Sequence, residues 1–189
     1  PSSPYAATKA AAELLINSYS ITFQSDVIIT RCTNNYGPRQ FPEKLIPKTI
    51  LLAEQNKKIP IYGNGKSIRD WIYVDDHCEA VMLALQKGKA GESYNISASN
   101  EIDVLTLVKK LLTLLGKPLN NLQFGESRPG EDLRYSLDSS KIRKELGWSH
   151  KINSDEGFQK TIQWYTENEN RLENLSKNTL SSTPWKDLT

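Results

Sequence analysis

Cysteine is scarce in this sequence, which has only Cys32 and Cys78 among its 189 residues. Neither cysteine belongs to a Cys-x-x-Cys pair or to a cluster of cysteine and histidine. This excludes a disulfide-stapled fold and gives no pattern for a structural metal site. Because disulfide-poor proteins are typical of reducing compartments, we expect a cytoplasmic protein.

Long apolar runs and an excess of one charge are also missing. The apolar runs fall far short of the ~20 residues that a membrane-spanning helix needs, and we expect no signal peptide. The 24 basic and 22 acidic residues nearly balance, with a formal net charge of +2. Such a balance lacks the single-sign field of nucleic-acid binders. We therefore expect neither a membrane nor a nucleic acid as a partner.

The sequence also lacks a glycine-rich loop for the phosphates of a dinucleotide. No Gly-x-Gly-x-x-Gly or Gly-x-x-Gly-x-x-Gly follows a predicted strand. The first residue is a proline rather than a methionine, and Pro1–Tyr5 has the pattern of a helix start inside a domain. We expect the chain to be the C-terminal part of a longer protein.

What is present is an alternation of helical and strand patterns, which predicts an α/β fold. Ser3 is expected to cap the first helix, with Pro4 at its first position. Asp75, Asp103 and Asp155 are expected to cap three later helices. We expect helices over 5–23, 43–55, 76–86, 104–115, 139–146 and 156–165, strands over 27–30, 59–62, 68–74, 93–97 and 122–124, a polar loop over 33–39 and a turn over 63–65.

Tyr5 and Lys9 are four residues apart in the first predicted helix, so their side chains share one face. A tyrosine is a poor base at neutral pH. A fixed cation nearby and the positive end of the helix dipole both favour the phenolate, which suits the group to proton transfer. The alternative is a chance pair, because Tyr-x-x-x-Lys occurs in many helices.

Residues 3–13 closely resemble the active-site helix of extended short-chain dehydrogenases/reductases, whose pattern is Pro-Tyr-x-x-(Ser/Thr)-Lys followed by small residues. Four further segments resemble nucleotide-sugar 4,6-dehydratases of that family, in order and in register: 31–38, 41–47, 68–71 and 128–132. The similarity covers roughly residues 1–166 and is greatest to dTDP-glucose 4,6-dehydratases. The resemblance implies the C-terminal part of such an NAD-dependent enzyme.

This resemblance implies roles for individual residues. Tyr5 would be the acid/base for hydride transfer, and Lys9 would bind the nicotinamide ribose of NAD. Asn35 would lie near the nicotinamide. The residues implied to bind the nucleotide sugar are Asn34, Lys44, Leu45, Pro60, Tyr62, Arg69, Arg128, Pro129, Gly130 and Asp132.

Two of these implied roles have plain alternatives. Asn34 and Asn35 could form a turn with local side-chain hydrogen bonds. The Arg69 guanidinium offers a planar fork for phosphate oxygens, but beside Asp70 it could equally form a solvated ion pair. The sequence departs from the family at Ile102, where many relatives have an asparagine, so no nucleotide contact is expected there.

The resemblance also implies an architecture. Residues 1–40 would be the remnant of an NAD-binding Rossmann domain, with the active-site helix and the strand after it. Residues 41–170 would form mainly a small mixed α/β substrate-binding domain, with some segments returning to the Rossmann domain. Residues 171–189 would be a loose tail.

The implied activity is the NAD-dependent conversion of dTDP-glucose into a 4-keto-6-deoxy sugar by a homodimer. Alternatives are an epimerase or decarboxylase of the same family, or a non-catalytic fragment that binds a nucleotide sugar. In the family, the Asp-Glu pair that eliminates water lies upstream of the tyrosine. We therefore expect the chain alone to be inactive. We also expect it to be only marginally folded, because the resemblance implies that the first strands of the parallel sheet are missing.

Overall fold

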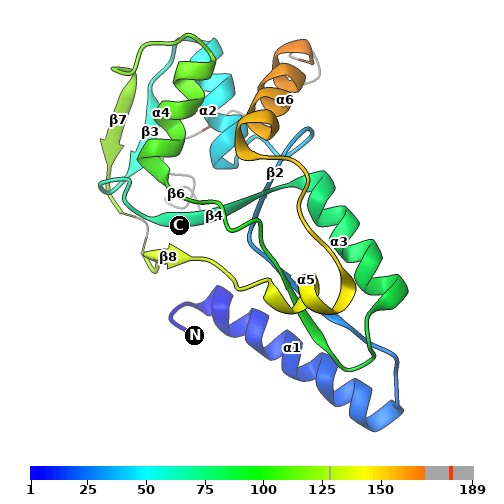
Figure 1. Ribbon diagram of the computed structural model, residues 1–189. Helices are drawn as coiled ribbons and strands as arrows, with labels where there is room; N and C mark the ends of the chain where they lie inside the picture. Colours follow the sequence, from blue (N-terminus) through cyan, green and yellow to red (C-terminus); the bar gives the residue numbers. More distant parts are fainter. Residues whose placement is uncertain (128, 169–178, 181–189) are drawn as a thin grey trace.

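The computed structural model of the chain describes residues 1–127, 129–168 and 179–180. Helices and strands alternate along it, which confirms the predicted α/β class (Figure 1). The helices are α1 (Pro4–Phe23), α2 (Leu45–Glu54), α3 (Val74–Lys87), α4 (Val104–Leu114), α5 (Ser140–Leu146) and α6 (Ser154–Glu167). The strands are β1 (Ile29–Cys32), β2 (Asn34–Tyr36), β3 (Ile59–Tyr62), β4 (Ile68–Tyr73), β5 (Ser93–Ile96), β6 (Glu101–Asp103), β7 (Leu122–Gly125) and β8 (Arg134–Tyr135).

The strands form three small sheets, in which most neighbours are parallel. β1 pairs with β5, and β3 pairs with β7, both in parallel. β4 is the centre of the third sheet, with β2 and β8 parallel to it and β6 antiparallel. Parallel neighbours need crossover connections, and each crossover here contains at least one helix or strand of another sheet.

Two packed regions follow from this topology. The first, which we call the lobe, gathers α2, α4 and α6 with β3, β7 and the β4 sheet, and Figure 1 shows α2, α4, β3 and β7 together at one end of the molecule. The second, which we call the β1 layer, consists of β1, β5, α3 and α5 around another buried cluster, which contains Tyr94 and Ile96 and is joined by Ile72 of β4. β5, α3 and α5 follow the lobe's first elements in sequence, so the chain passes between the two regions more than once.

Apolar spacing explains the core of the lobe. In α4, apolar residues three and four positions apart form one fully buried face: Leu107, Val108, Leu111 and Leu112. Asp103 caps this helix as predicted, and its carboxylate accepts a hydrogen bond of 2.9 Å from the Thr106 amide. α2 faces α4 with Ile46 and Ile50, which have no exposed surface.

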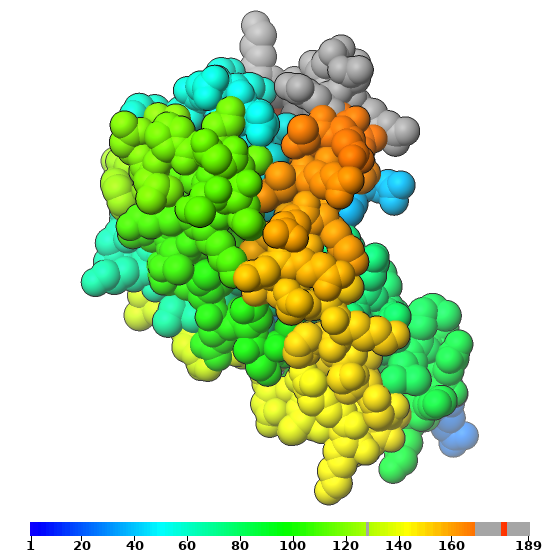
Figure 2. Space-filling view, turned by 45° about the horizontal axis from the view of Figure 1, so that its top comes forward, coloured from blue at the N-terminus to red at the C-terminus, as the bar shows by residue number. Residues whose placement is uncertain are grey.

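The segment between α5 and α6 connects the β1 layer to the lobe. The buried Asp76 carboxylate of α3 accepts hydrogen bonds from the amides of Lys151 at 2.8 Å and Ile152 at 3.1 Å. The Trp148 indole donates to the Asp76 carbonyl at 3.2 Å. Figure 2 shows α4 in green, α6 in orange and this connecting segment in yellow as one continuous surface.

Several predicted boundaries differ from the structure. Asp75 and Asp155 were expected to cap helices, and this was wrong: both lie inside the first turn, and Tyr73 and Asn153 are the N-cap residues. The Asn153 side chain accepts a hydrogen bond of 3.0 Å from the Glu156 amide, as aspartate would. β1 begins at Ile29, two residues later than predicted.

The predicted polar loop over 33–39 contains β2, and this part of the prediction was wrong. The polar residues of β2 form a strand because Asn34, Asn35 and Tyr36 pair with Trp71, Ile72 and Tyr73 of β4. The short strands β6 and β8 were not predicted either, and both also pair with β4. The predicted strands on either side of the 63–65 turn exist, but they belong to different sheets.

The α1 helix is the least packed helix of the described structure. Ser3 caps it as predicted, with its hydroxyl oxygen accepting from the Ala6 amide at 3.1 Å. None of its residues is buried, and Leu14 and Ile21 are 71% and 81% exposed.

At the other end of the chain, Thr179 is buried and Leu180 packs on the lobe, and the rest of the predicted tail from 171 lies outside the described residues. No helix that the structure describes is long and apolar enough to span a membrane.

Candidate functional site

The first two turns of α1 present the predicted acid/base pair. Tyr5 is 73% exposed, and Lys9 is also exposed one turn further on. Their four-residue separation in a regular helix places both side chains on one face. The phenol and the ammonium are therefore both accessible to a ligand.

A bidentate ion pair joins α1 to β1. Arg31 donates to Glu13 through Nε at 2.7 Å and through Nη2 at 2.5 Å. The hydrogen bonds from Arg31 hold the pKa of the Glu13 carboxyl below its ordinary range, with a smaller contribution from Lys9. Since Glu13 is four residues beyond Lys9, the face of α1 that holds Tyr5 and Lys9 also faces β1.

Tyr135 of β8 is a member of the site that the sequence prediction missed. Its hydroxyl donates to the Cys32 carbonyl, at the end of β1, over 2.9 Å. Burial raises the pKa of Tyr135, and the nearby Cys32, Tyr5 and Asp132 each add to the rise. The end of β1, β8 and the start of α1 therefore meet around this tyrosine. A sequence signal existed, since Tyr135 follows the recognised 128–132 segment at a short distance.

Arg69 lies on β4, with only 14% of its side chain exposed. Its Nη1 donates to the Ile68 carbonyl at 2.8 Å, and its Nη2 donates to Glu131 Oε1 at 3.4 Å. The partner of Arg69 is thus Glu131, and the alternative of an ion pair with Asp70 is not observed. The long bond to Glu131 leaves a guanidinium that could exchange this carboxylate for another anion.

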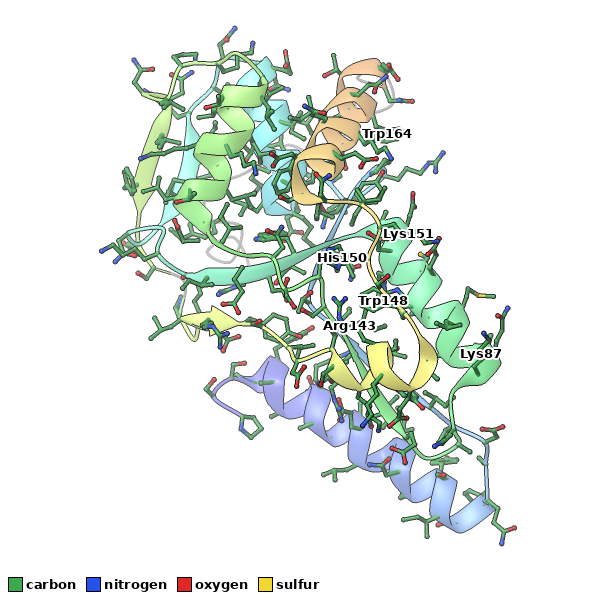
Figure 3. All side chains as sticks on the ribbon, in the orientation of Figure 1. Lys87, Arg143, Trp148, His150, Lys151 and Trp164 are labelled. Carbon is green, nitrogen blue, oxygen red and sulfur yellow. The ribbon has the colours of Figure 1, made fainter. Side chains whose placement is uncertain are left out.

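Asp70 points away from Arg69, because successive strand residues face opposite sides. It is fully buried, and its carboxylate accepts from the Ser97 hydroxyl and, at 2.9 Å, from the Asn100 amide. The Ser97 carbonyl accepts in turn from Arg143, whose guanidinium lies 5.1 Å from the Trp148 ring (Figure 3). Asp70 therefore fixes the loop from β5 to β6 against β4.

The 129–132 loop lies against the start of α1. Gly130 has a φ of 69°, and a Cβ at this position would lie 3.6 Å from the Ser3 Cβ. Pro129 and Asp132 are exposed beside it. Arg128, the predicted second diphosphate-binding arginine, lies outside the described residues. Through Glu131 and Gly130, this loop connects Arg69 to the turn that holds Tyr5.

Asn34 and Asn35 lie in β2, just beyond the end of β1. The Asn35 amide donates to Cys32 Sγ at 3.2 Å and to the Thr33 carbonyl at 3.4 Å, so local side-chain bonding does occur here, although within a strand rather than a turn. The Oδ1 atoms of both asparagines are buried and accept no hydrogen bond within the described residues. Buried acceptors without donors are uncommon, and they indicate a place where a ligand or water completes the bonding.

The remaining predicted residues lie along the lobe. Lys44 is the exposed N-cap residue of α2, with its ammonium 4.0 Å from Glu43, and Leu45 is half-buried against the lobe core. Pro60 and Tyr62 alternate in β3 with buried isoleucines, so they share the opposite face of the strand. A Cβ on Gly63, next in sequence, would lie 2.4 Å from the Ser127 hydroxyl, so this strand end borders the segment before the 129–132 loop.

The structure thus brings some of the predicted residues together. Tyr5, Gly130 and Arg69 are connected through direct neighbours, with Cys32 and Tyr135 at the centre. Asn34 and Asn35 border this group through Cys32. The arrangement combines an exposed phenol and ammonium with a guanidinium, which suits proton transfer on one part of a ligand and anion binding on another.

The parallel strand pairs, the crossovers and the active-site-like helix define part of a Rossmann fold of the extended short-chain dehydrogenase/reductase class, as predicted. The family model for GDP-mannose 4,6-dehydratase matches residues 1–161. The chain belongs to this dehydratase family.

Known relatives are similar over most of the chain. A dTDP-glucose 4,6-dehydratase from Neisseria gonorrhoeae is 44% identical over 185 residues, covering 92% of this chain and 54% of that protein. The solved dTDP-glucose 4,6-dehydratase from Streptomyces venezuelae, with NAD and dTDP bound, is 43% identical with a TM-score of 0.91, covering 93% of this chain and 55% of that one.

An epimerase shares the fold at lower identity. A UDP-glucuronic acid 4-epimerase from Bacillus cereus is 29% identical with a TM-score of 0.84, covering 88% of this chain and 54% of that one. The chain spans about half the length of the curated relatives it matches.

Proposed function

We propose that this chain supplies the acid/base helix and the nucleotide-sugar-binding lobe of an NAD-dependent dTDP-glucose 4,6-dehydratase. The observation that carries the proposal is the connection between two kinds of group. The exposed Tyr5 and Lys9 start a helix that lies against the 129–132 loop, and Glu131 of that loop holds Arg69. The identity of 44% to a dTDP-glucose 4,6-dehydratase supports the same activity.

In the proposed reaction, Tyr5 removes the proton of the sugar 4-hydroxyl as its base. Lys9, one turn further along the same helix face, would bind the nicotinamide ribose beside Tyr5. NAD, when bound, supplies the acceptor for the C4 hydride. The exposure of both side chains and the unpartnered oxygens of Asn34 and Asn35 fit a cofactor and a sugar in this region.

The substrate diphosphate would be held by Arg69 and Arg128. A diphosphate can replace the 3.4 Å contact of Arg69 with Glu131 by shorter, charge-assisted hydrogen bonds. Asn35 would lie near the nicotinamide. The other residues proposed to contact the nucleotide sugar are Asn34, Lys44, Leu45, Pro60, Tyr62, Pro129, Gly130 and Asp132.

We further propose the finer organisation that the family resemblance implies. Residues 1–40 would belong to the cofactor domain, and residues 41–170 mainly to the substrate domain. The whole protein would be a cytoplasmic homodimer. The apolar side chains exposed on α1 support this proposal, because a helix with an apolar, unburied face needs a covering partner.

Turnover assays test the proposed function. The chain is joined to the N-terminal half of the Neisseria gonorrhoeae relative, and dTDP-glucose is supplied with NAD. We expect a 4-keto-6-deoxy product from the joined protein and none from the chain alone. Tyr5→Phe should abolish the product, whereas Tyr19→Phe, an exposed tyrosine of the same helix, should not.

Three outcomes of this assay would contradict the proposal. Product formation by the chain alone would show that it needs no further half. Full activity of Tyr5→Phe would remove the proposed base. A C4 epimer in place of the keto-sugar would instead favour the epimerase alternative, which the likeness to the Bacillus cereus epimerase makes specific.

A further inference from the structure

Tyr5, Lys9 and Glu13 follow each other at four-residue intervals along α1. Side chains at this spacing form a row on one helix face, each about one turn from the next. The row presents a phenol, an ammonium and a carboxylate in order from the helix start. The first two belong to the proposed reaction, and the third has no place in it.

The carboxylate at the end of this row is the point where α1 is fixed. The Glu13 carboxylate accepts two hydrogen bonds from Arg31, from Nε at 2.7 Å and from Nη2 at 2.5 Å. The side chains of Glu13 and Arg31 are 32% and 37% exposed, respectively. Within residues 1–127, 129–168 and 179–180, no other ion pair or side-chain hydrogen bond joins α1 to another strand or helix. Since α1 has no buried residue in this chain, the pair is its most specific polar contact with the rest of the described structure.

The charges of the pair also bear on Lys9. Glu13 is close enough to Lys9 for the ammonium to contribute to the lowered pKa of the Glu13 carboxyl. A carboxylate without another partner would attract the Lys9 ammonium along the helix. Arg31 satisfies both oxygens of Glu13, which leaves the ammonium free for other groups.

We propose that Glu13 and Arg31 are positioning residues for the acid/base helix. The bidentate ion pair between Arg31 and Glu13 fixes the rotation of α1 about its axis, so that Tyr5 and Lys9 face the end of β1 and Tyr135. It also keeps the Lys9 ammonium available to the ribose and to Tyr5. The catalytic part of this inference rests on the proposed function, and the anchoring of α1 does not.

Hydrogen exchange on the chain itself tests the anchoring. The variants are Glu13→Gln, Arg31→Gln and the two together, with Glu79→Gln as a control that breaks the exposed pair with Lys151. We expect each single variant to speed exchange of the α1 amides roughly five-fold and the double variant to add nothing further. Exchange in α4 should not change. Additive effects of the two single variants would overturn the proposal.

Kinetics of the joined protein test the positioning. We expect Arg31→Gln to lower kcat roughly ten-fold while KM for the nucleotide sugar stays unchanged, because the pair acts on the helix and not on the diphosphate site. Exchanging the two charges, with Glu13→Arg and Arg31→Glu, should restore much of kcat. An unchanged kcat in Arg31→Gln, or an effect on KM alone, would overturn the positioning role.

The two tests separate this inference from the proposed function. If the unvaried joined protein is inactive with dTDP-glucose, the proposed function fails. The anchoring by Glu13 and Arg31 is then tested by hydrogen exchange of the α1 amides alone. A double variant that exchanges no faster than the single variants supports the anchoring, and additive effects of the single variants overturn it.

Discussion

The α4 and α1 helices begin alike and end up in very different surroundings. Both have a capping side chain that accepts from the third residue after it, at 2.9 Å for Asp103 and 3.1 Å for Ser3. The apolar face of α4 is fully buried, as at Leu111, whereas on α1 Ile21 is 81% exposed. An apolar helix pattern therefore predicts the helix correctly and says nothing about whether its packing partner lies within the same chain.

The lobe and the α1 helix are expected to differ in stability. The lobe has its own buried core, to which α2, α4 and α6 all contribute. The α1 helix depends on its cap, on Glu13 with Arg31, and on contacts of its first turn with the 129–132 loop. We expect the lobe to unfold as one cooperative unit and α1 to open at a lower free energy.

The largest effect should come from truncating apolar side chains in the two helices. Leu111→Ala in α4 should lower the free energy of unfolding by about 2–5 kcal/mol, because it opens a cavity in a fully packed core. Ile21→Ala in α1 should change it by no more than about 0.5 kcal/mol. Urea unfolding measures both. Equal effects would show that α1 is packed as well as α4.

The next effect concerns the buried carboxylate between the two regions. Asp70→Ala removes the acceptor of the buried Ser97 hydroxyl and of the half-buried Asn100 amide. We expect a loss of about 1–3 kcal/mol in the free energy of unfolding. Asp75→Ala, at an exposed position of α3, is the matched control. If Asp70→Ala and Asp75→Ala lowered the free energy of unfolding equally little, the contacts of Asp70 with the loop from β5 to β6 would not belong to the cooperative unit.

The two capping residues give a smaller and more discriminating effect. Asp103→Ala should lower the free energy of unfolding by about 1 kcal/mol, because α4 belongs to the lobe. Ser3→Ala should speed hydrogen exchange at the start of α1 and leave the urea midpoint of the lobe unchanged. A shift of the urea midpoint in Ser3→Ala would mean that α1 and the lobe unfold together.

The smallest effect is a dependence of α1 on pH. The hydrogen bonds from Arg31 keep the pKa of Glu13 below its ordinary value of 4.5. The contribution of the pair is therefore complete above that value and is lost as the pH falls through the lower, folded-state pKa. Helix content and exchange of α1 should show the loss as the pH falls below this ordinary value of 4.5. Arg31→Gln should remove this dependence, and its persistence in that variant would assign it to another group.

Local signals predicted the helices well. Ser3 and Asp103 cap the helices that the sequence assigned to them, because a cap depends on residues within one turn. The caps assigned to Asp75 and Asp155 were wrong, since each helix begins one residue before its aspartate. Capping patterns locate a helix start to within a turn.

Contacts between residues far apart in the chain could not be predicted from the sequence. β2 exists because its polar residues find β4 more than thirty positions later in the chain, and β8 likewise depends on β4. The site shows the same limit. Tyr135 meets the Cys32 carbonyl across 103 positions, and Glu131 meets Arg69 across 62, so no local pattern could pair them. The motif resemblance supplied the candidate residues, while the structure supplied their neighbours.

Calorimetric titration of the chain with dTDP tests the central claim that the lobe binds a nucleotide diphosphate at Arg69. We expect measurable binding of dTDP, tighter than that of UDP. Arg69→Gln should weaken it at least roughly ten-fold, and Lys109→Gln, at an exposed position of α4, should leave it unchanged. An absence of binding to the folded chain, or equal binding by Arg69→Gln and the unvaried chain, would show that Arg69 does not hold the diphosphate.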